Sequence, residues 1–229
     1  MIERIKAIVR PILRPPVHAV EIKRPYKVYG TEYGGWPLID GSVDERSTIL
    51  SVGLGEDISF DLEVIDRFGC VVHGCDPTPK SLAWLSSQDL PAKFHVHALG
   101  LGEVDGPAAF IPPANDAHVS FSATRGKGQA GDAIEIDVCT LPTMIDRVGV
   151  DRLDVLKMDI EGFEYGVIRQ MVASTIRPAQ ILVEFHHRMY GYRPEDTRRA
   201  VEMLQGAGYR IFYVSPGGHE YGLVLTDGA

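Results

Sequence analysis

The chain has 229 residues, a length that suits one well-cored domain rather than two. Hydrophobic residues make up 45% of the sequence and charged residues 24%, as in an ordinary soluble globular protein. The net charge of −8 argues against nucleic acid as the main partner, because binding a phosphate backbone needs a basic surface. No apolar run approaches the roughly 20 residues of a membrane span, so none is expected.

Residues 1–47 form an N-terminal arm that precedes the first predicted core strand. The start, MIERIKAIVRPILRPP, is basic and partly apolar, but prolines interrupt it and no small-residue cleavage site follows. We therefore expect no secretory signal, and instead a short amphipathic helix at about residues 2–9 before a proline-rich segment. This arm is also a candidate contact for a homodimer.

The three cysteines, Cys70, Cys75 and Cys139, lack the spacing of metal ligands. Their odd number does not make a disulfide framework, and Cys70 and Cys75 lie in or beside one apolar run. We expect buried thiols and a reducing, cytoplasmic location.

From residue 48 onward, apolar runs typical of buried strands alternate with helical patterns. The first half of this region predicts strands at 48–52, 70–76 and 93–99, with helices at about 58–68 and from Pro79. Pro79 suits the first position of a helix, because its missing N–H has no helical partner there.

The second half predicts strands at 133–141, 153–159 and 179–185, each followed by a helix, and then a terminal antiparallel hairpin. A polar, glycine-rich segment at 112–131 interrupts this pattern and is either a mobile lid or a loose insertion. The alternation predicts an α/β domain over 48–229, in which helices cover a mostly parallel sheet.

In an open α/β sheet, ligands bind outside the carboxyl ends of the strands. The first such end carries SVGLGEDISFD, in which Gly53 and Gly55 would let backbone approach a cofactor, although a simple tight turn is the alternative. The next strand ends at Asp76 and Pro77. A carboxylate this far after the glycines suits the ribose hydroxyls of an adenosine-type ligand, and the alternative is an aspartate that forms the turn before Pro77.

The charge of the glycine loop indicates which cofactor it holds. A dinucleotide fingerprint needs glycine where this chain has Ile58, and no Walker lysine follows. Glu56 and Asp57 would repel pyrophosphate but attract the sulfonium and ammonium groups of S-adenosylmethionine. One acid is expected to meet the ammonium group and one to cap the following helix. Leu99, at the end of the third strand, completes the expected cofactor contacts.

The most specific motif is LDVLKMDIEGFEYGVI, at residues 153–168. It resembles the FkbM family of S-adenosylmethionine-dependent methyltransferases, whose hallmark is a strand of the form Lys-Ile-Asp-x-Glu-Gly-x-Glu before a helix. The matching positions are Lys157, Asp159, Glu161, Gly162 and Glu164. The resemblance covers about residues 48–226. It implies a class I methyltransferase fold: Rossmann-like, with a mostly parallel seven-stranded sheet and a C-terminal antiparallel hairpin.

The resemblance also implies roles for residues near this motif. Asp159 would lie near the methionine end of the cofactor or near the acceptor. Glu161 would stand at a helix start, either in contact with substrate or as a cap. Lys157, inside a buried strand, is expected to have a carboxylate partner. Tyr33 and Trp36 are candidates for an acceptor-facing wall, with packing as the alternative.

The fifth strand ends in VEFHHRMYGY, where Glu184 and His186 share one face of the strand and His187 points the other way. O-methylation requires the acceptor oxygen to lose its proton, so His186 is a candidate general base and Glu184 and Asp159 are candidate catalytic residues. Alternatively, these three bind a Mg²⁺-like ion that lowers the acceptor's pKa. In a third interpretation, the histidines satisfy backbone groups. His187 is also a candidate substrate contact.

These features predict an S-adenosylmethionine-dependent methyltransferase that acts on a hydroxyl of a small molecule such as a sugar or secondary metabolite. An NAD(P)-dependent oxidoreductase is one alternative, disfavoured by Ile58 and by the terminal hairpin. A non-catalytic methyltransferase-like scaffold is the other.

Overall fold

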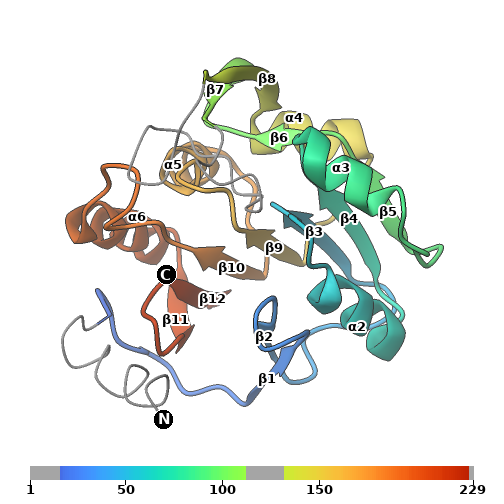
Figure 1. The fold of residues 1–229 in the computed structure, drawn as a ribbon. Coiled ribbons are helices and arrows are strands. Elements are labelled where there is room, and N and C mark those ends of the chain that lie inside the picture. Colours follow the sequence, from blue (N-terminus) through green and yellow to red (C-terminus); the bar gives the residue numbers. More distant parts are fainter. Residues whose placement is uncertain (1–15, 112–131, 227–229) are drawn as a thin grey trace, which may run out of the picture.

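The fold is built around a seven-stranded sheet in the computed structural model, which describes residues 16–111 and 132–226 (Figure 1). The expected helix at residues 2–9 and the expected lid or insertion at 112–131 lie outside the described residues. The strand order is β11-β12-β10-β9-β3-β4-β5. In chain order the strands are β3 (Thr48–Val52), β4 (Val71–Cys75), β5 (Phe94–His97), β9 (Val155–Met158), β10 (Gln180–Glu184), β11 (Tyr209–Val214) and β12 (Glu220–Leu225).

All neighbouring strands in this sheet are parallel except those that pair with β12, which runs antiparallel to both β10 and β11. The predicted sheet with a C-terminal hairpin is therefore confirmed. The chain proceeds from β3 toward one edge and from β9 toward the other, so β3 and β9 flank the switch in strand order. Val52 pairs with Met158, which brings the carboxyl ends of these two strands together. A ligand site is expected there.

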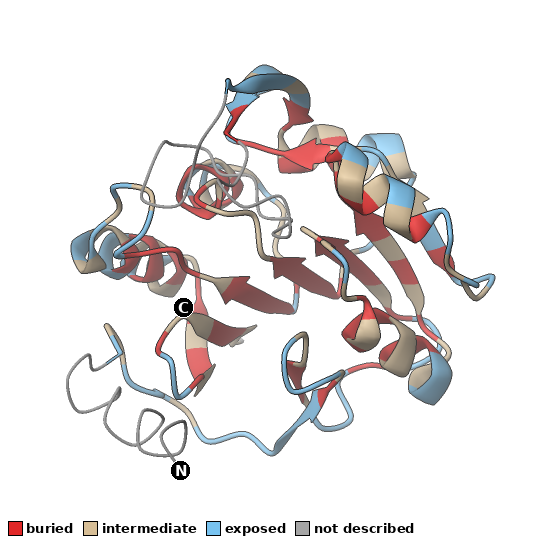
Figure 2. Cartoon of the chain, viewed as in Figure 1, coloured by how far each residue is buried: buried red, intermediate tan, exposed pale blue. Residues whose placement is uncertain are grey.

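Helices cover both faces of the sheet, and the central strands between them are buried (Figure 2). One apolar core joins its first face to α4 (Leu141–Val148), α5 (Glu164–Ala173) and α6 (Pro194–Gly206). The other joins the opposite face to α2 (Ser59–Phe68) and α3 (Pro79–Leu85). As the sequence predicts, α3 begins with Pro79, and α2 ends where Gly69 adopts a left-handed conformation that glycine reaches without strain.

A short hairpin of β1 (Tyr26–Tyr29) and β2 (Trp36–Ile39) precedes the main sheet. Its side chains Tyr29, Trp36 and Leu38 are buried in the same core as α2. The end of the N-terminal arm is therefore packed onto the domain. The sequence analysis did not predict these two strands, because glycines and aromatic residues in this segment give no clear alternation.

A second, three-stranded sheet lies between the main-sheet strands β5 and β9 in the chain. It consists of β6 (Gly100–Leu101), β7 (Gly106–Phe110) and β8 (Ile134–Cys139), in the order β6-β8-β7. The strand predicted at 133–141 is therefore present but belongs to this small sheet. Within the described part of the chain, no helix is long and apolar enough to cross a membrane.

Candidate active site

The glycine loop, residues 53–57, begins at the carboxyl end of β3 and passes directly against β9. Gly53 has a φ of 79°, and a Cβ added to it would lie 1.7 Å from the carbonyl oxygen of Asp159. No side chain fits such a space, so glycine is required here. Gly55 is left-handed as well, with a φ of 56°. The cofactor contact expected of the two glycines stays a prediction.

Asp76 holds this loop in place. One of its carboxylate oxygens accepts hydrogen bonds from the N–H groups of Leu54 and Gly55, at 3.0 and 3.1 Å. The other accepts from the N–H and hydroxyl of Thr78, at 2.9 and 2.6 Å. A carboxylate has about four lone-pair sites, so Asp76 has none left for a ribose hydroxyl in this conformation. In this structure the Asp76 side chain connects the glycine loop to the end of β4. This role is similar to the turn-forming alternative that the sequence offered.

The two acids of the loop have different surroundings. Asp57 accepts a hydrogen bond from the Ser59 N–H at the start of α2, at 2.8 Å, and another from Thr31 Oγ1, also at 2.8 Å. Ile58 occupies the N-cap of α2, so Asp57 binds the first helical N–H from the residue before the cap, a contact close to the one expected of an acid. Glu56 is exposed, and its contact with the cofactor's ammonium group stays a prediction. A glycine loop beside an exposed acid fits a cationic cofactor.

Lys157 lies beneath the loop with only 5% of its surface exposed. Its Nζ donates a hydrogen bond to the Gly53 carbonyl at 3.1 Å and lies 5.4 Å from the ring centroid of Trp36. The expected direct carboxylate partner is absent among the described residues. The buried carboxyl of Asp61 is near enough to feel this charge: burial raises its pKa to about 6, and Lys157 opposes the shift.

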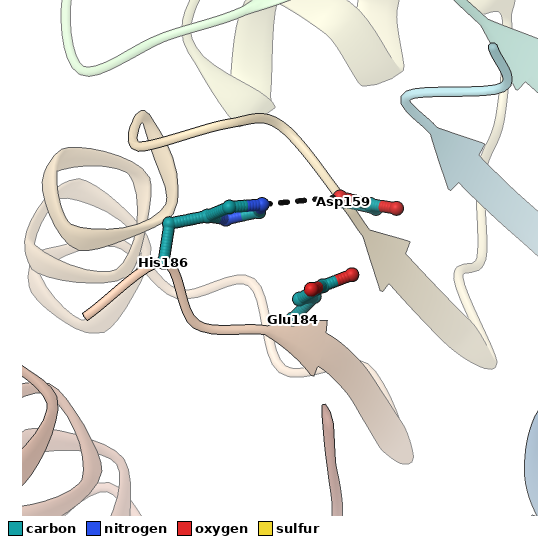
Figure 3. Close-up of side chains that lie close together, drawn as sticks. All are labelled: Asp159, Glu184 and His186. Atoms are coloured by element: carbon teal, nitrogen blue, oxygen red, sulfur yellow. Dashed lines mark ion pairs between the residues drawn. The ribbon is translucent and has the colours of Figure 1, made fainter. Parts of the chain in front are cut away.

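Four polar side chains meet at the carboxyl ends of β9 and β10: Asp159, Glu161, Glu184 and His186. We call them the carboxylate–histidine cluster. Nε2 of His186 lies 3.0 Å from Glu161 Oε2 and 3.6 Å from Asp159 Oδ1. In Figure 3, the side chains of Asp159, Glu184 and His186 point toward one another from these two strand ends. The structure thus brings together the three residues that the sequence proposed for catalysis or metal binding.

His186 is oriented by Glu164, a residue to which the sequence assigned no role. Glu164 is completely buried at the start of α5, and its Oε1 accepts the backbone N–H of His186 at 2.8 Å and faces Nδ1 at 3.1 Å. Its Oε2 accepts the Gly162 N–H at 2.8 Å. The signal that would have found this residue is a carboxylate in the first turn of the helix, next to its buried apolar residues, since such a group must have buried partners.

The protein environment shifts the pKa values of Asp159, Glu184 and His186 in the cluster. Burial raises the pKa of Asp159 to about 6, although His186 opposes the shift. Burial and then the charge of Asp159 raise the pKa of Glu184 to about 9. Burial alone would lower the pKa of His186, but Glu164 and Glu161 raise it well above the usual value. With 2% of its surface exposed and carboxylates at both nitrogens, His186 is poorly suited to be the general base.

Backbone strain concentrates around the cluster. The non-glycine residues with positive φ in the described chain are Glu161, Arg188 and Tyr190, at 52°, 68° and 52°. The hydroxyl of Tyr190 donates a hydrogen bond to Glu161 Oε2 at 2.5 Å. Strained backbone persists where the surrounding structure enforces it, and it is commonest at functional sites.

The remaining predicted contacts occupy different places. Tyr33 is exposed, yet desolvation and then the charges of Asp159 and Glu184 raise the pKa of its hydroxyl. Trp36 is buried under Lys157, in agreement with the packing alternative.

His187 faces away from the cluster. It is fully buried, with Nδ1 3.1 Å from the Thr197 hydroxyl and its ring stacked on His219. This environment argues against a direct contact with substrate. Pro77 and Leu99 lie at the ends of β4 and β5, and the Pro77 ring packs against Gly100.

The order of the main sheet and its single antiparallel strand define a class I methyltransferase fold. Consistent with this, the fibrillarin pre-rRNA processing protein of Methanococcus jannaschii aligns with 93% of this chain and 100% of its own, with a TM-score of 0.51 at 12% identity. That likeness concerns the fold alone. A solved methyltransferase FkbM from Methylobacillus flagellatus aligns at 16% identity and a TM-score of 0.48, over 80% of this chain and 44% of its own.

The methyltransferase FkbM domain model matches residues 51–211, and the chain belongs to this family. Probable methyltransferase-like protein 24 of Rattus norvegicus is 27% identical over 180 residues, which are 74% of this chain. The match spans 43% of the rat protein, so this chain covers less than half of that relative's length. Family membership confirms the resemblance seen in the sequence and S-adenosylmethionine as the cofactor.

Proposed function

We propose that this protein transfers a methyl group from S-adenosylmethionine to a hydroxyl oxygen of a small molecule, such as a sugar or a secondary metabolite. The observation that supports this is the contact between Gly53 and the Asp159 backbone. It joins the glycine loop to the carboxylate–histidine cluster at the switch in strand order. Cofactor and acceptor would therefore meet beside several proton-accepting groups.

The glycine loop and the carboxylate–histidine cluster would have different roles in the reaction. When bound, S-adenosylmethionine supplies an electrophilic methyl group on a sulfonium. The glycine loop would hold the cofactor, with Glu56 at its ammonium group. The cluster would orient the acceptor hydroxyl so that an oxygen lone pair attacks the methyl carbon as the carbon–sulfur bond breaks. The acceptor's proton would pass to a carboxylate of the cluster, and S-adenosylhomocysteine would leave.

The surroundings of the site support a hydroxyl acceptor rather than a nucleic acid. The chain carries a net charge of −8, and the cluster adds local negative charge where a phosphate backbone would have to approach. Tyr33, exposed above these carboxylates, is the proposed acceptor contact from the N-terminal side. The three buried, unpaired cysteines support a cytoplasmic location.

The test is methyl transfer from S-adenosylmethionine to matched panels of hydroxyl and amine acceptors, with products identified by mass spectrometry. We expect methyl ethers, and a turnover at least about 100-fold lower in Asp159→Asn, the range typical of lost acid–base catalysis. Asp105→Asn, which removes an exposed carboxylate that binds Thr140 and Thr143, is the matched control and should keep turnover. Methylation confined to amines would overturn the proposal.

A further inference from the structure

The carboxylate–histidine cluster contains a buried carboxylate oxygen, Oδ1 of Asp159, that has no hydrogen-bond partner among the described residues. Both ring nitrogens of His186 face carboxylates, Nδ1 at 3.1 Å from Glu164 and Nε2 at 3.0 Å from Glu161. Two acceptors cannot share one imidazole proton across the ring. One imidazole proton therefore satisfies only one of these carboxylates. The other needs a second imidazole proton, a proton of its own or a cation beside Nε2.

A second imidazole proton leaves the cluster incomplete. It would be donated to Glu161, the nearer oxygen, whereas Oδ1 of Asp159 is buried without a hydrogen-bond partner. The side chain of Glu184 also forms no hydrogen bond within residues 16–111 and 132–226. No lysine or arginine of these ranges forms an ion pair with either carboxylate. Such groups are costly to leave unpaired in a partly buried site.

We propose that Asp159, Glu184 and His186 bind a divalent cation through one oxygen of each carboxylate and Nε2 of the imidazole. These ligand atoms lie within 4.8 Å of one another (Figure 3). An ion about 2.1 Å from each ligand holds them no more than about 4.2 Å apart, so a small rotation of the half-buried Glu184 closes the set. Two carboxylates with one imidazole suit Mn²⁺ or Mg²⁺ rather than a metal that prefers thiolates.

The buried Glu164 provides the support that such a site needs. By accepting the Nδ1 proton of His186, it fixes the tautomer that leaves a lone pair on Nε2, directed into the cluster. Its two other hydrogen bonds, to backbone N–H groups of Gly162 and His186, hold the carboxylate still. A carboxylate behind the imidazole is the usual arrangement at histidine-ligated metals.

The position of the site indicates what the bound cation would do in the reaction. The Asp159 backbone contacts the glycine loop at Gly53, so the ion would lie beside the cofactor's reactive end. There it would lower the pKa of a coordinated hydroxyl. This task rests on the proposed methyl transfer, whereas cation binding rests on the geometry alone.

The binding test uses the full chain with Mn²⁺ alone, without cofactor or acceptor, so that its outcome is independent of the proposed function. We expect calorimetry to show one saturable site, competition by Mg²⁺, and nitrogen coupling from the imidazole in pulsed electron paramagnetic resonance. Absence of saturable binding at millimolar Mn²⁺ in folded protein would overturn the proposal, and so would binding without nitrogen coupling. His186 would then act as a protonated bridge only.

The Mn²⁺ affinity of single-residue variants tests which side chains bind the ion. Glu184→Gln should lower Mn²⁺ affinity at least about 10-fold, and Glu164→Gln about 10- to 100-fold through lost orientation of His186. The control is Glu220→Gln, which removes the same charge from the β12 residue paired with Glu184. It should change affinity less than about 3-fold. Equal losses from Glu184→Gln and Glu220→Gln would indicate diffuse charge attraction and contradict the site. Circular dichroism and thermal unfolding confirm that each variant folds.

Discussion

The glycine loop and the carboxylate–histidine cluster lie side by side but are built in opposite ways. In the loop, polar groups are satisfied by the chain itself: Asp76 makes four hydrogen bonds, and Asp57 binds the start of α2. In the cluster, carboxylates converge on His186, and Oδ1 of Asp159 has no hydrogen-bond partner among the described residues. The loop is therefore preorganised, whereas we propose that a bound cation completes the cluster.

This difference separates two kinds of residue within one active site. Changes in the loop should reduce stability and cofactor affinity together, because its contacts already exist in the free protein. Changes at Asp159 or Glu184 should affect bound cations and turnover more than folding, because Oδ1 of Asp159 and the Glu184 side chain have no hydrogen bond to lose among the described residues.

The largest effect is expected for Gly53→Ala in the loop. A Cβ would overlap the Asp159 carbonyl at 1.7 Å in a left-handed backbone, so unfolding free energy should fall by about 4 kcal/mol or more. Gly41→Ala is the matched control, because Gly41 has a φ of 71° but nothing within 4 Å of the added Cβ. It should lose only about 1–2 kcal/mol in urea unfolding. Equal losses would show that the contact with β9 is unimportant.

The next largest effect is expected when the two aromatic residues near the site, Trp36 and Tyr33, are each replaced by alanine. Trp36→Ala removes a side chain that is 4% exposed and packed under Lys157, and should cost about 3–5 kcal/mol of unfolding free energy. Tyr33→Ala should change stability by no more than about 0.5 kcal/mol, because Tyr33 is 91% exposed, while raising KM for the acceptor. An unchanged KM for Tyr33→Ala would remove this residue from the acceptor site.

Asp76→Asn tests whether preorganisation of the loop matters for cofactor binding. The amide keeps the shape of the side chain but replaces an oxygen that accepts two hydrogen bonds with a donor. Affinity for S-adenosylhomocysteine, measured by calorimetry, should fall about 10-fold or more. Asp105→Asn, which alters an exposed carboxylate that binds the Thr140 N–H before α4, should leave that affinity unchanged. Unchanged affinity in Asp76→Asn would show that its hydrogen bonds do not shape the loop.

The smallest effect is expected for His73 and His97, whose pKa values are lowered, whereas that of His186 is raised. His73 Nδ1 lies 3.0 Å from His97 Nε2, and burial with the neighbouring imidazoles lowers the pKa of His73 to about 4 and also lowers that of His97. The unfolded state therefore binds protons first, so stability is full above pH 6.5 and declines as pH falls toward 4. His73→Gln should show a smaller drop in Tm between pH 7 and pH 5 than wild type. An identical drop would contradict this origin.

Much of the fold was predictable because it depends on local patterns. Buried apolar runs marked the strands, Gly69 ended α2, and Pro79 began α3. The predicted cofactor followed from the charge of the glycine loop and the family from the motif around Asp159, and both are confirmed. The grouping of Asp159, Glu184 and His186 followed from their positions at strand ends.

Other features depend on side-chain direction and long-range packing, which spacing does not encode. The spacing of Asp76 suited a ribose ligand, but its carboxylate turns back to the loop. Lys157 was expected to pair with a carboxylate and instead bonds to a carbonyl under Trp36. Glu164 acquires its role only when α5 places it behind His186.

The most direct test of the central claim, a methyltransferase site at the glycine loop, is a calorimetric titration of the full chain with S-adenosylhomocysteine and, separately, with NAD. We predict saturable binding of S-adenosylhomocysteine at one site per chain and no binding of NAD. Binding of NAD without S-adenosylhomocysteine would contradict the account.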